Sequence, residues 1–145
     1  MPDFADYSPE LTRDFRGVRL WLPLHLHGVA AFRDTLDEKL DLAEYAHDEL
    51  AEDANLTVLR RPELSVVAFH CRLPGGDVSA EDDATAELLR RVNAEQRAFL
   101  SSTRVAGRHV ARIVVLNHRT DHTRVAETVA TVRRHAADLA SGSRP

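Results

Sequence analysis

Two pairs of short strand-like segments, separated by one helical segment, restrict the fold of this 145-residue chain more than any other feature. The first pair covers residues 56–60 and 64–73, and apolar residues alternate with period two through "LSVVAFHCRL". The second pair lies on either side of Ala106-Gly107 in "SSTRVAGRHVARIVVLN". Strands this short, with helical segments around them, predict an α+β domain: a small antiparallel sheet with helices packed on one face.

The helical segments show apolar residues at steps of three and four. One covers residues 30–54, where the opposite face is acidic and the apolar stripe consists of Phe32, Leu36, Leu40, Ala43, His47 and Leu50. Ser79 with Asp82 resembles a capping box and predicts a helix to about Leu100, with Phe99 facing inward. The last helix is expected to begin after a cap at Thr120 or Asp121, with one apolar stripe formed by Val125, Val129, Val132, Ala136 and Leu139.

The chain opens with an apolar stretch, "DFRGVRLWLPLHLHGVAAF", at residues 14–32. Ser8-Pro9 looks like a helix start, and the following apolar residues lie on more than one side, which is typical of a long helix buried from several directions. Pro23 is expected to kink or divide this helix. We therefore predict a connecting helical segment at residues 1–29, the α+β domain at 30–140 and a disordered tail at 141–145.

Composition excludes several classes of protein. Hydrophobic residues make up 43% of the chain and charged residues 29%, a globular balance, and the formal net charge of -4 argues against nucleic acid as a partner. The single cysteine forms no internal disulfide, which fits a reducing cytoplasm. The acidic N-terminus has no signal-peptide pattern, and no apolar run is long enough to cross a bilayer.

The histidines do not form a convincing metal site. His25 and His27 point about 200° apart on a helix, so packing is the favoured interpretation over shared ligation. The His118 and His122 spacing suits zinc on a continuous helix, but the expected helix cap falls between them. His47 lies on an apolar stripe, where a hydrogen-bonded core or interface histidine is favoured over a catalytic one.

Nucleophile candidates are equally weak. Ser101-Ser102-Thr103 lacks a nucleophile-elbow motif, so these residues are interpreted as hydroxyls at a strand edge. Cys71 is expected on the inward face of a strand and to be inert. No glycine-rich phosphate loop, acid–base pair or metal-ligand cluster stands out.

Arg112 is the one candidate site residue. It shares a strand face with Val114 and Leu116, and a guanidinium in so apolar a strand needs an anion or a route to water. One alternative is a structural ion pair with an acidic side chain of this chain. The other is a receptor for a carboxylate or phosphate at the edge of the domain.

Several strings taken together resemble a known family. "YSPELTRDFRGVRLWLPLHLHGVAAF", "LSVVAFHCRL" and "LLRRVNAEQRAFLSSTRVAGRHVARIVVLNHRTDHTRV" are similar, in order and spacing, to the C-terminal small domain of group II pyridoxal-phosphate-dependent amino acid decarboxylases. This is the aromatic-amino-acid, histidine and glutamate decarboxylase family. The matching positions in the last string are Leu89, Asn93, Gly107, Arg112, Asn117, Arg119 and Thr120.

The resemblance implies the small domain of a fold-type I enzyme, packed on a large domain that holds pyridoxal phosphate. Family enzymes are homodimers that remove the α-carboxylate of an amino acid, with the pyridine ring as electron sink. Arg112 matches an arginine that approaches the substrate carboxylate in some relatives. The opening segment corresponds to the helix that connects the two domains.

The chain departs from the family in one decisive way: it has no counterpart of the Schiff-base lysine. Lys39 is its only lysine and lies in the acidic string "DEKLD", whereas a Schiff-base lysine needs an environment that favours the free amine. We therefore expect no covalent pyridoxal phosphate on this chain and no activity of the chain alone. It is interpreted as a carboxy-lyase C-terminal domain on a short separate chain, either a truncated product or one half of a split enzyme. The expected partner is a second copy of the chain or a partner chain that carries the large domain. The alternatives are a non-enzymatic dimerisation module with the same fold and an anion-binding domain centred on Arg112.

Overall fold

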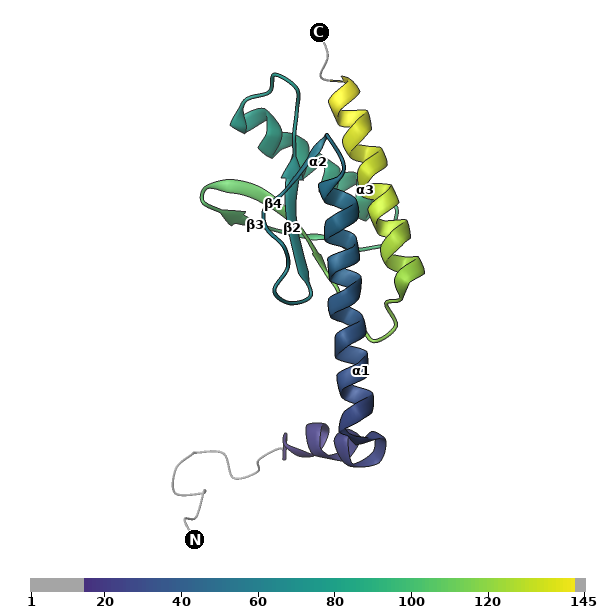
Figure 1. Cartoon of the computed structure of the whole chain (residues 1–145). Helices are drawn as coiled ribbons and strands as arrows, with labels where there is room; N and C mark the ends of the chain where they lie inside the picture. Colours follow the sequence, from purple (N-terminus) through teal and green to yellow (C-terminus); the bar gives the residue numbers. More distant parts are fainter. Residues whose placement is uncertain (1–14, 143–145) are drawn as a thin grey trace, which may run out of the picture. The chain divides into compact units, whose positions relative to one another are not determined.

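The structure, a computed structural model, describes residues 15–142 and divides the chain into two compact units, residues 1–35 and 36–145. Three helices and four strands follow one another in the chain (Figure 1). In order they are α1 (Val18–Ala51), β1 (Leu56–Val58), β2 (Val66–Cys71), α2 (Val78–Ala94), β3 (Ser101–Val105), β4 (Arg108–Val114) and α3 (His122–Gly142). The predicted α+β class is confirmed.

The four strands form one antiparallel sheet in the order β1-β2-β4-β3. β2 and β4 are the central pair, in which Val67 lies opposite Ile113 and Phe69 opposite Ala111. These four residues share one face because side chains alternate along a strand. All four are nearly inaccessible to solvent, so this is the face that the helices cover.

The core lies between this sheet face and one stripe from each helix. The largest fully buried side chains include Phe69, Leu50 and Leu88. The helix residues of the core are Leu42, Ala43, Ala46 and Leu50 of α1, Ala84, Leu88, Leu89 and Val92 of α2, and Val125, Val129, Val132, Ala136 and Ala140 of α3. The stripe predicted for the last helix is therefore confirmed, and the helices pack on one face of the sheet.

The buried stripe of α1 differs from the sequence-based one. Leu36 and Leu40 were expected to face inward, but they are 63% and 36% exposed, and Leu42 and Ala46 are buried instead. The charge pattern of the sequence does not identify the buried side of α1, because this side also includes the charged residue Lys39. Periodicity gave the helix but not the rotation of its apolar side toward the sheet.

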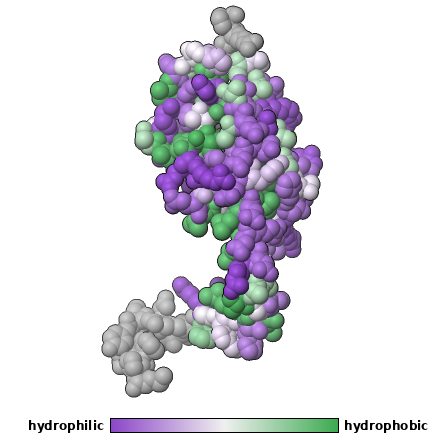
Figure 2. Space-filling model, in the orientation of Figure 1, coloured by the Kyte–Doolittle hydropathy of each residue, from purple (hydrophilic) through white to green (hydrophobic). Residues whose placement is uncertain are grey.

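Within α1 the backbone departs from helical geometry at Gly28, with φ 80° and ψ 158°, and not at Pro23, where the break was expected. Proline removes a single donor, which one turn of helix can tolerate, whereas glycine adopts positive φ without a steric penalty. The apolar residues of this stretch are also not buried as expected: Leu20, Trp21 and Leu26 are 63%, 59% and 67% exposed. Figure 2 shows hydrophobic side chains at the surface of this N-terminal unit. The expected start at Ser8-Pro9 lies outside the described residues.

Three predicted boundaries need correction. The cap of α2 is Asp77, whose side chain accepts a hydrogen bond from the Ala80 amide, and not Ser79. α2 ends at Ala94, so Phe99 lies in the following loop and is 84% exposed. α3 continues to Gly142, so the helix includes two residues of the predicted tail. Asp121 caps α3 by accepting a hydrogen bond from the Arg124 amide at 2.9 Å.

The β3–β4 hairpin turns at Ala106-Gly107, as predicted. Both residues have positive φ, 49° and 83°, which is the backbone of a two-residue type I′ turn. Glycine adopts this region freely, but alanine at Ala106 does so at a cost of about 1 kcal/mol. The turn therefore stores strain at a single position.

We expect Ala106→Asn to raise the free energy of unfolding by about 0.5–1 kcal/mol, because asparagine tolerates positive φ better than alanine does. Urea denaturation followed by circular dichroism measures the change. Gly107→Ala is the matched control and should lower stability by about 1 kcal/mol through backbone strain, since an added Cβ at Gly107 meets no atom within 4 Å. Equal effects of the same sign from both variants would contradict this account of the turn.

Candidate functional site

The face of the sheet opposite the core carries the candidate site. Strand alternation places Val66, Ala68, Arg112 and Val114 there, and the register sets Val66 opposite Val114 and Ala68 opposite Arg112. Val66 and Val114 are 40% and 42% exposed, although both belong to central strands. Apolar residues at one end of the two central strands are thus open to solvent on this face, which we call the outer face.

Arg112 lies in the middle of the outer face, opposite Ser101 on its other side. Its Nε atom is buried and has no hydrogen-bond partner, and no ion pair to Arg112 occurs among residues 15–142. The structural alternative, an ion pair within the chain, is therefore not found in this part of the molecule. A buried N–H without a partner costs about 1–3 kcal/mol, which an anionic oxygen bound at this position would recover.

Arg108, a second arginine on the same strand, has hydrogen-bond partners within the chain. Arg108 donates to Glu81 at 2.7 Å and to Asp82 at 3.0 Å, both from the first turns of α2. Its Nη2 atom also lies 3.4 Å from Nδ1 of His70. Arg108 is therefore a structural residue that ties α2 to the sheet, and Arg112 is the arginine of β4 left for another partner.

An apolar hollow of about 300 Å³ lies at one end of the sheet. Four leucines line it, Leu36, Leu40, Leu64 and Leu116, and Leu64 and Leu116 are 72% and 73% exposed. Sequence analysis did not identify this hollow. If the alternation of side chains is continued beyond the ends of β2 and β4, Leu64 and Leu116 fall on the outer face. No pattern in the sequence predicts that leucines of α1 lie beside them.

Lys39 does not fit the role of a Schiff-base lysine. Its side chain is 6% exposed, and Nζ donates to the Thr120 carbonyl at 2.6 Å and pairs with Glu38 at 3.1 Å. An amine that forms an imine must be a free nucleophile with access to the aldehyde. Lys39 is instead a structural cation that joins α1 to the loop before α3, so no other lysine of this chain is left to hold pyridoxal phosphate.

His25 and His47 each contact a neighbouring side chain. His25 stacks on Trp21 with ring centroids 4.9 Å apart. Nδ1 of His47 lies 2.8 Å from the Asp48 carboxylate at the protein surface. These contacts agree with the non-catalytic interpretations.

The remaining chemical candidates are also explained by structure. His122 packs against Tyr45 with centroids 4.4 Å apart, and residues 15–142 contain no group of three potential metal ligands. Ser101 and Thr103 lie on β3, at the edge of the sheet, as expected. Cys71 is buried, and desolvation raises the pKa of its thiol to about 11. No helix in the described part has the length and apolarity needed to cross a membrane.

Two residues of the family-like motifs have clear structural roles. Asn93, near the end of α2, donates to the Leu100 carbonyl at 3.0 Å and accepts from the Leu100 amide at 2.8 Å. This pair of hydrogen bonds closes the loop between α2 and β3 much as a strand partner would. Gly107 supplies the positive φ of the hairpin. These motif residues therefore serve the fold and not the chemistry.

No protein-family model matches the chain. Among curated proteins it is 29% identical over 135 residues to tyrosine decarboxylase 2 of Arabidopsis thaliana, covering 93% of this chain and 25% of that protein. It is 30% identical over 113 residues to tryptophan decarboxylase 2 of Oryza sativa, covering 78% and 23%. It is 26% identical over 139 residues to the aromatic-L-amino-acid decarboxylase of Bacillus atrophaeus, covering 94% and 29%.

The solved structures agree. The structure of Oryza sativa TDC with PLP and tryptamine matches 94% of this chain with a TM-score of 0.86 and 24% identity, over 30% of its own length. The chain is homologous to a C-terminal portion of the group II pyridoxal-phosphate-dependent decarboxylases. Rhodiola rosea 4-hydroxyphenylacetaldehyde synthase matches 97% of it with a TM-score of 0.86 and 22% identity, over 30% of that protein. The chain thus spans between about a quarter and a third of the group II relatives it matches.

We expect Lys39→Met to lower the free energy of unfolding by about 1–3 kcal/mol, because the Thr120 carbonyl loses its donor. Glu38→Gln is the matched control. It removes only the ion pair between Lys39 and the half-exposed Glu38, and it should lower the free energy of unfolding by less than about 1 kcal/mol. Urea denaturation of the two variants separates the contributions. A Lys39→Met protein as stable as the parent would show that Lys39 is not the structural cation described.

The thiol of Cys71 should react very slowly with an aromatic disulfide reagent in the folded protein. With a pKa of about 11, on the order of 0.1% is thiolate at about pH 8, and burial blocks access as well. In urea the same thiol should react at the rate of an ordinary exposed cysteine. Fast reaction of the native chain at its single cysteine would contradict the inert interpretation.

Proposed function

We propose that this chain serves as the C-terminal part of a pyridoxal-phosphate-dependent decarboxylase of aromatic amino acids. The observation that carries the proposal is the match to nearly all of this chain in proteins that are three to four times longer. The lysine that holds the cofactor comes from residues outside these 145, because Lys39 is already bound to Thr120 and Glu38. The substrate class follows from relatives named as tyrosine, tryptophan and aromatic-L-amino-acid decarboxylases.

The outer face supports this proposal because it exposes apolar side chains to solvent. Val66 and Val114 are exposed at one end of the central strands. The exposed residues Leu64 and Leu116 of the apolar hollow lie two positions beyond them in the chain. Contiguous apolar surface of this kind usually meets another protein surface. We infer that the part of the enzyme with the cofactor lysine packs on the outer face.

Arg112 is the polar anchor of this proposal. Its buried Nε needs an anionic oxygen, and in a decarboxylase two carboxylates are available: one from the large domain and one from the amino acid substrate. We assign Arg112 to the substrate carboxylate, following the family resemblance. This chain contributes no other residue to the chemistry in our proposal, and the assembled enzyme is a cytoplasmic homodimer.

The alternative of a non-enzymatic dimerisation module is not favoured. Its starting point was the exposed apolar opening helix, and residues of that helix are indeed exposed, such as Trp21 at 59%. The comparisons, however, match the opening helix and the α+β unit together, over 94% of the chain, to one continuous decarboxylase. Contacts with the rest of such an enzyme account for each of the two exposed regions.

A chimaera tests the proposal. In it, the segment of rice tryptophan decarboxylase 2 that matches this chain is replaced by residues of this chain. We expect the chimaera to release carbon dioxide from tryptophan in the presence of pyridoxal phosphate, and the truncated rice protein without a C-terminal portion to release none. The 145-residue chain alone, treated with pyridoxal phosphate and then borohydride, should show no added mass at Lys39. An adduct at Lys39, or a folded and cofactor-loaded chimaera no more active than the truncated protein, would overturn the proposal.

The same chimaera tests Arg112. Arg112→Gln should raise KM for the amino acid about tenfold or more, since a charge-assisted hydrogen bond is lost. Arg104→Gln, on the neighbouring strand and 71% exposed, is the control and should leave KM unchanged. A change in stability of Arg112→Gln without a change in KM would assign Arg112 to the domain interface.

A further inference from the structure

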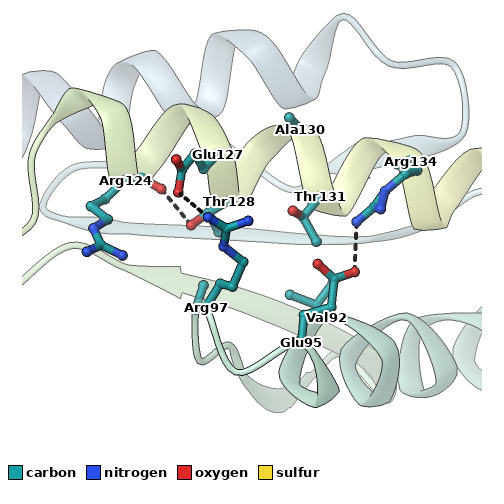
Figure 3. Close-up of a pocket in the computed structure, with 10 residues that line it drawn as sticks. Val92, Glu95, Arg97, Arg124, Glu127, Thr128, Ala130, Thr131 and Arg134 are labelled. Atoms are coloured by element: carbon teal, nitrogen blue, oxygen red, sulfur yellow. Dashed lines mark hydrogen bonds and ion pairs between the residues drawn. The ribbon is translucent and has the colours of Figure 1, made fainter.

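A groove with an excess of arginines lies between the loop that follows α2, the end of β4 and the first turns of α3. It consists of two adjoining hollows of about 400 and 300 Å³. Arg97 and Arg124 line both hollows, and Arg119 lines the second. Figure 3 shows Arg97 on the loop and Arg124 on the helix, at the same end of the first hollow.

The charges of these arginines are poorly compensated. Within residues 15–142, Arg119 and Arg124 form no ion pair, and Arg97 reaches only Glu127, at 3.9 Å. The other carboxylate of the groove, Glu95, is already engaged by Arg134 at 2.7 Å and His135 at 2.6 Å. The hydrogen bond from His135 helps to lower the pKa of Glu95, which stays ionised for those partners.

This imbalance runs against the rest of the chain. The formal net charge is -4, so free carboxylates are in excess overall. Several exposed arginines elsewhere on the α+β unit have close acidic neighbours, such as Arg90 with Glu87 at 2.6 Å and Arg61 with Glu44 at 3.2 Å. The two carboxylates of the groove are distant, as Glu127 is, or already engaged, as Glu95 is. The three arginines therefore repel one another, and a bound anion reduces that repulsion.

The other lining residues suit a phosphate ligand with an aromatic part. Asn117, Thr120 and Thr128 add short polar side chains, and Phe99 is 84% exposed beside them. Guanidinium groups bind phosphate oxygens in a bidentate manner, and an open aromatic ring stacks on a base. We propose that this groove, lined by Arg97, Arg119 and Arg124, binds a polyphosphate chain, carried either by a nucleotide or by inorganic polyphosphate.

The proposal does not rest on the decarboxylase assignment, because that assignment gives none of the three arginines a role, although Val114 of the outer face also lines the second hollow. Isothermal titration of the 145-residue chain with ATP and, separately, with tripolyphosphate measures binding, without magnesium and at about 0.1 M salt to suppress weak surface effects. We expect saturable one-to-one binding of at least one of the two probes. Tighter binding of ATP, lost in Phe99→Ala, identifies the nucleotide; equal binding of both probes identifies the inorganic chain.

Paired variants separate the groove from general charge. Arg97→Gln with Arg124→Gln should weaken binding about tenfold or more, as expected for the loss of charge-assisted bonds. Arg60→Gln with Arg90→Gln is the control pair. It removes the same amount of charge from two arginines that do not line the groove and whose side chains are 70% and 69% exposed. We expect the affinity for the probe to stay within about twofold. Thermal melts confirm that each variant is folded. Absence of saturable binding of either probe, or equal weakening by both pairs of variants, overturns the proposal.

Discussion

Burial on a single face of the sheet is the constraint on which the α+β unit depends. In β2 and β4 the residues of one parity, such as Val67, Phe69 and Ala111, are sealed by stripes from all three helices. Residues of the other parity are covered only in part: Arg108 pairs with α2, and Val110 is buried, whereas Val66 and Val114 are exposed. Because the period of a strand is two, this choice of face decides at once where the core lies and which residues remain for contacts with other molecules.

The arginines of the chain divide according to the same geometry. Arg108 and Arg133 connect helices to the sheet or to one another through two carboxylates each. Arg112 lies on the uncovered side, where its Nε has no partner. A buried guanidinium N–H without a partner destabilises an isolated domain. In our proposal an oxygen from outside this chain becomes its hydrogen-bond acceptor.

The family resemblance turns out to rest mainly on residues that build the domain. Asn93 closes the α2–β3 loop with two hydrogen bonds to Leu100, and Gly107 permits the β3–β4 turn. The Thr120 carbonyl accepts a hydrogen bond from Lys39, the single lysine of the sequence. These motif residues thus belong to the scaffold, and in our proposal the catalytic lysine comes from outside the 145 residues.

The sequence by itself determined the α+β class, the hairpin at Ala106-Gly107, the stripe of the last helix and the lack of a suitable lysine, because each follows from local periodicity, turn chemistry or residue count. It also singled out Arg112, since a charge in an apolar strand is visible without coordinates. The tertiary structure decided which side of α1 is buried, the exposure of Phe99 and the grouping of Arg97, Arg119 and Arg124. Those features depend on where helices end and how they rotate toward the sheet, and such placements arise from packing between segments distant in the chain.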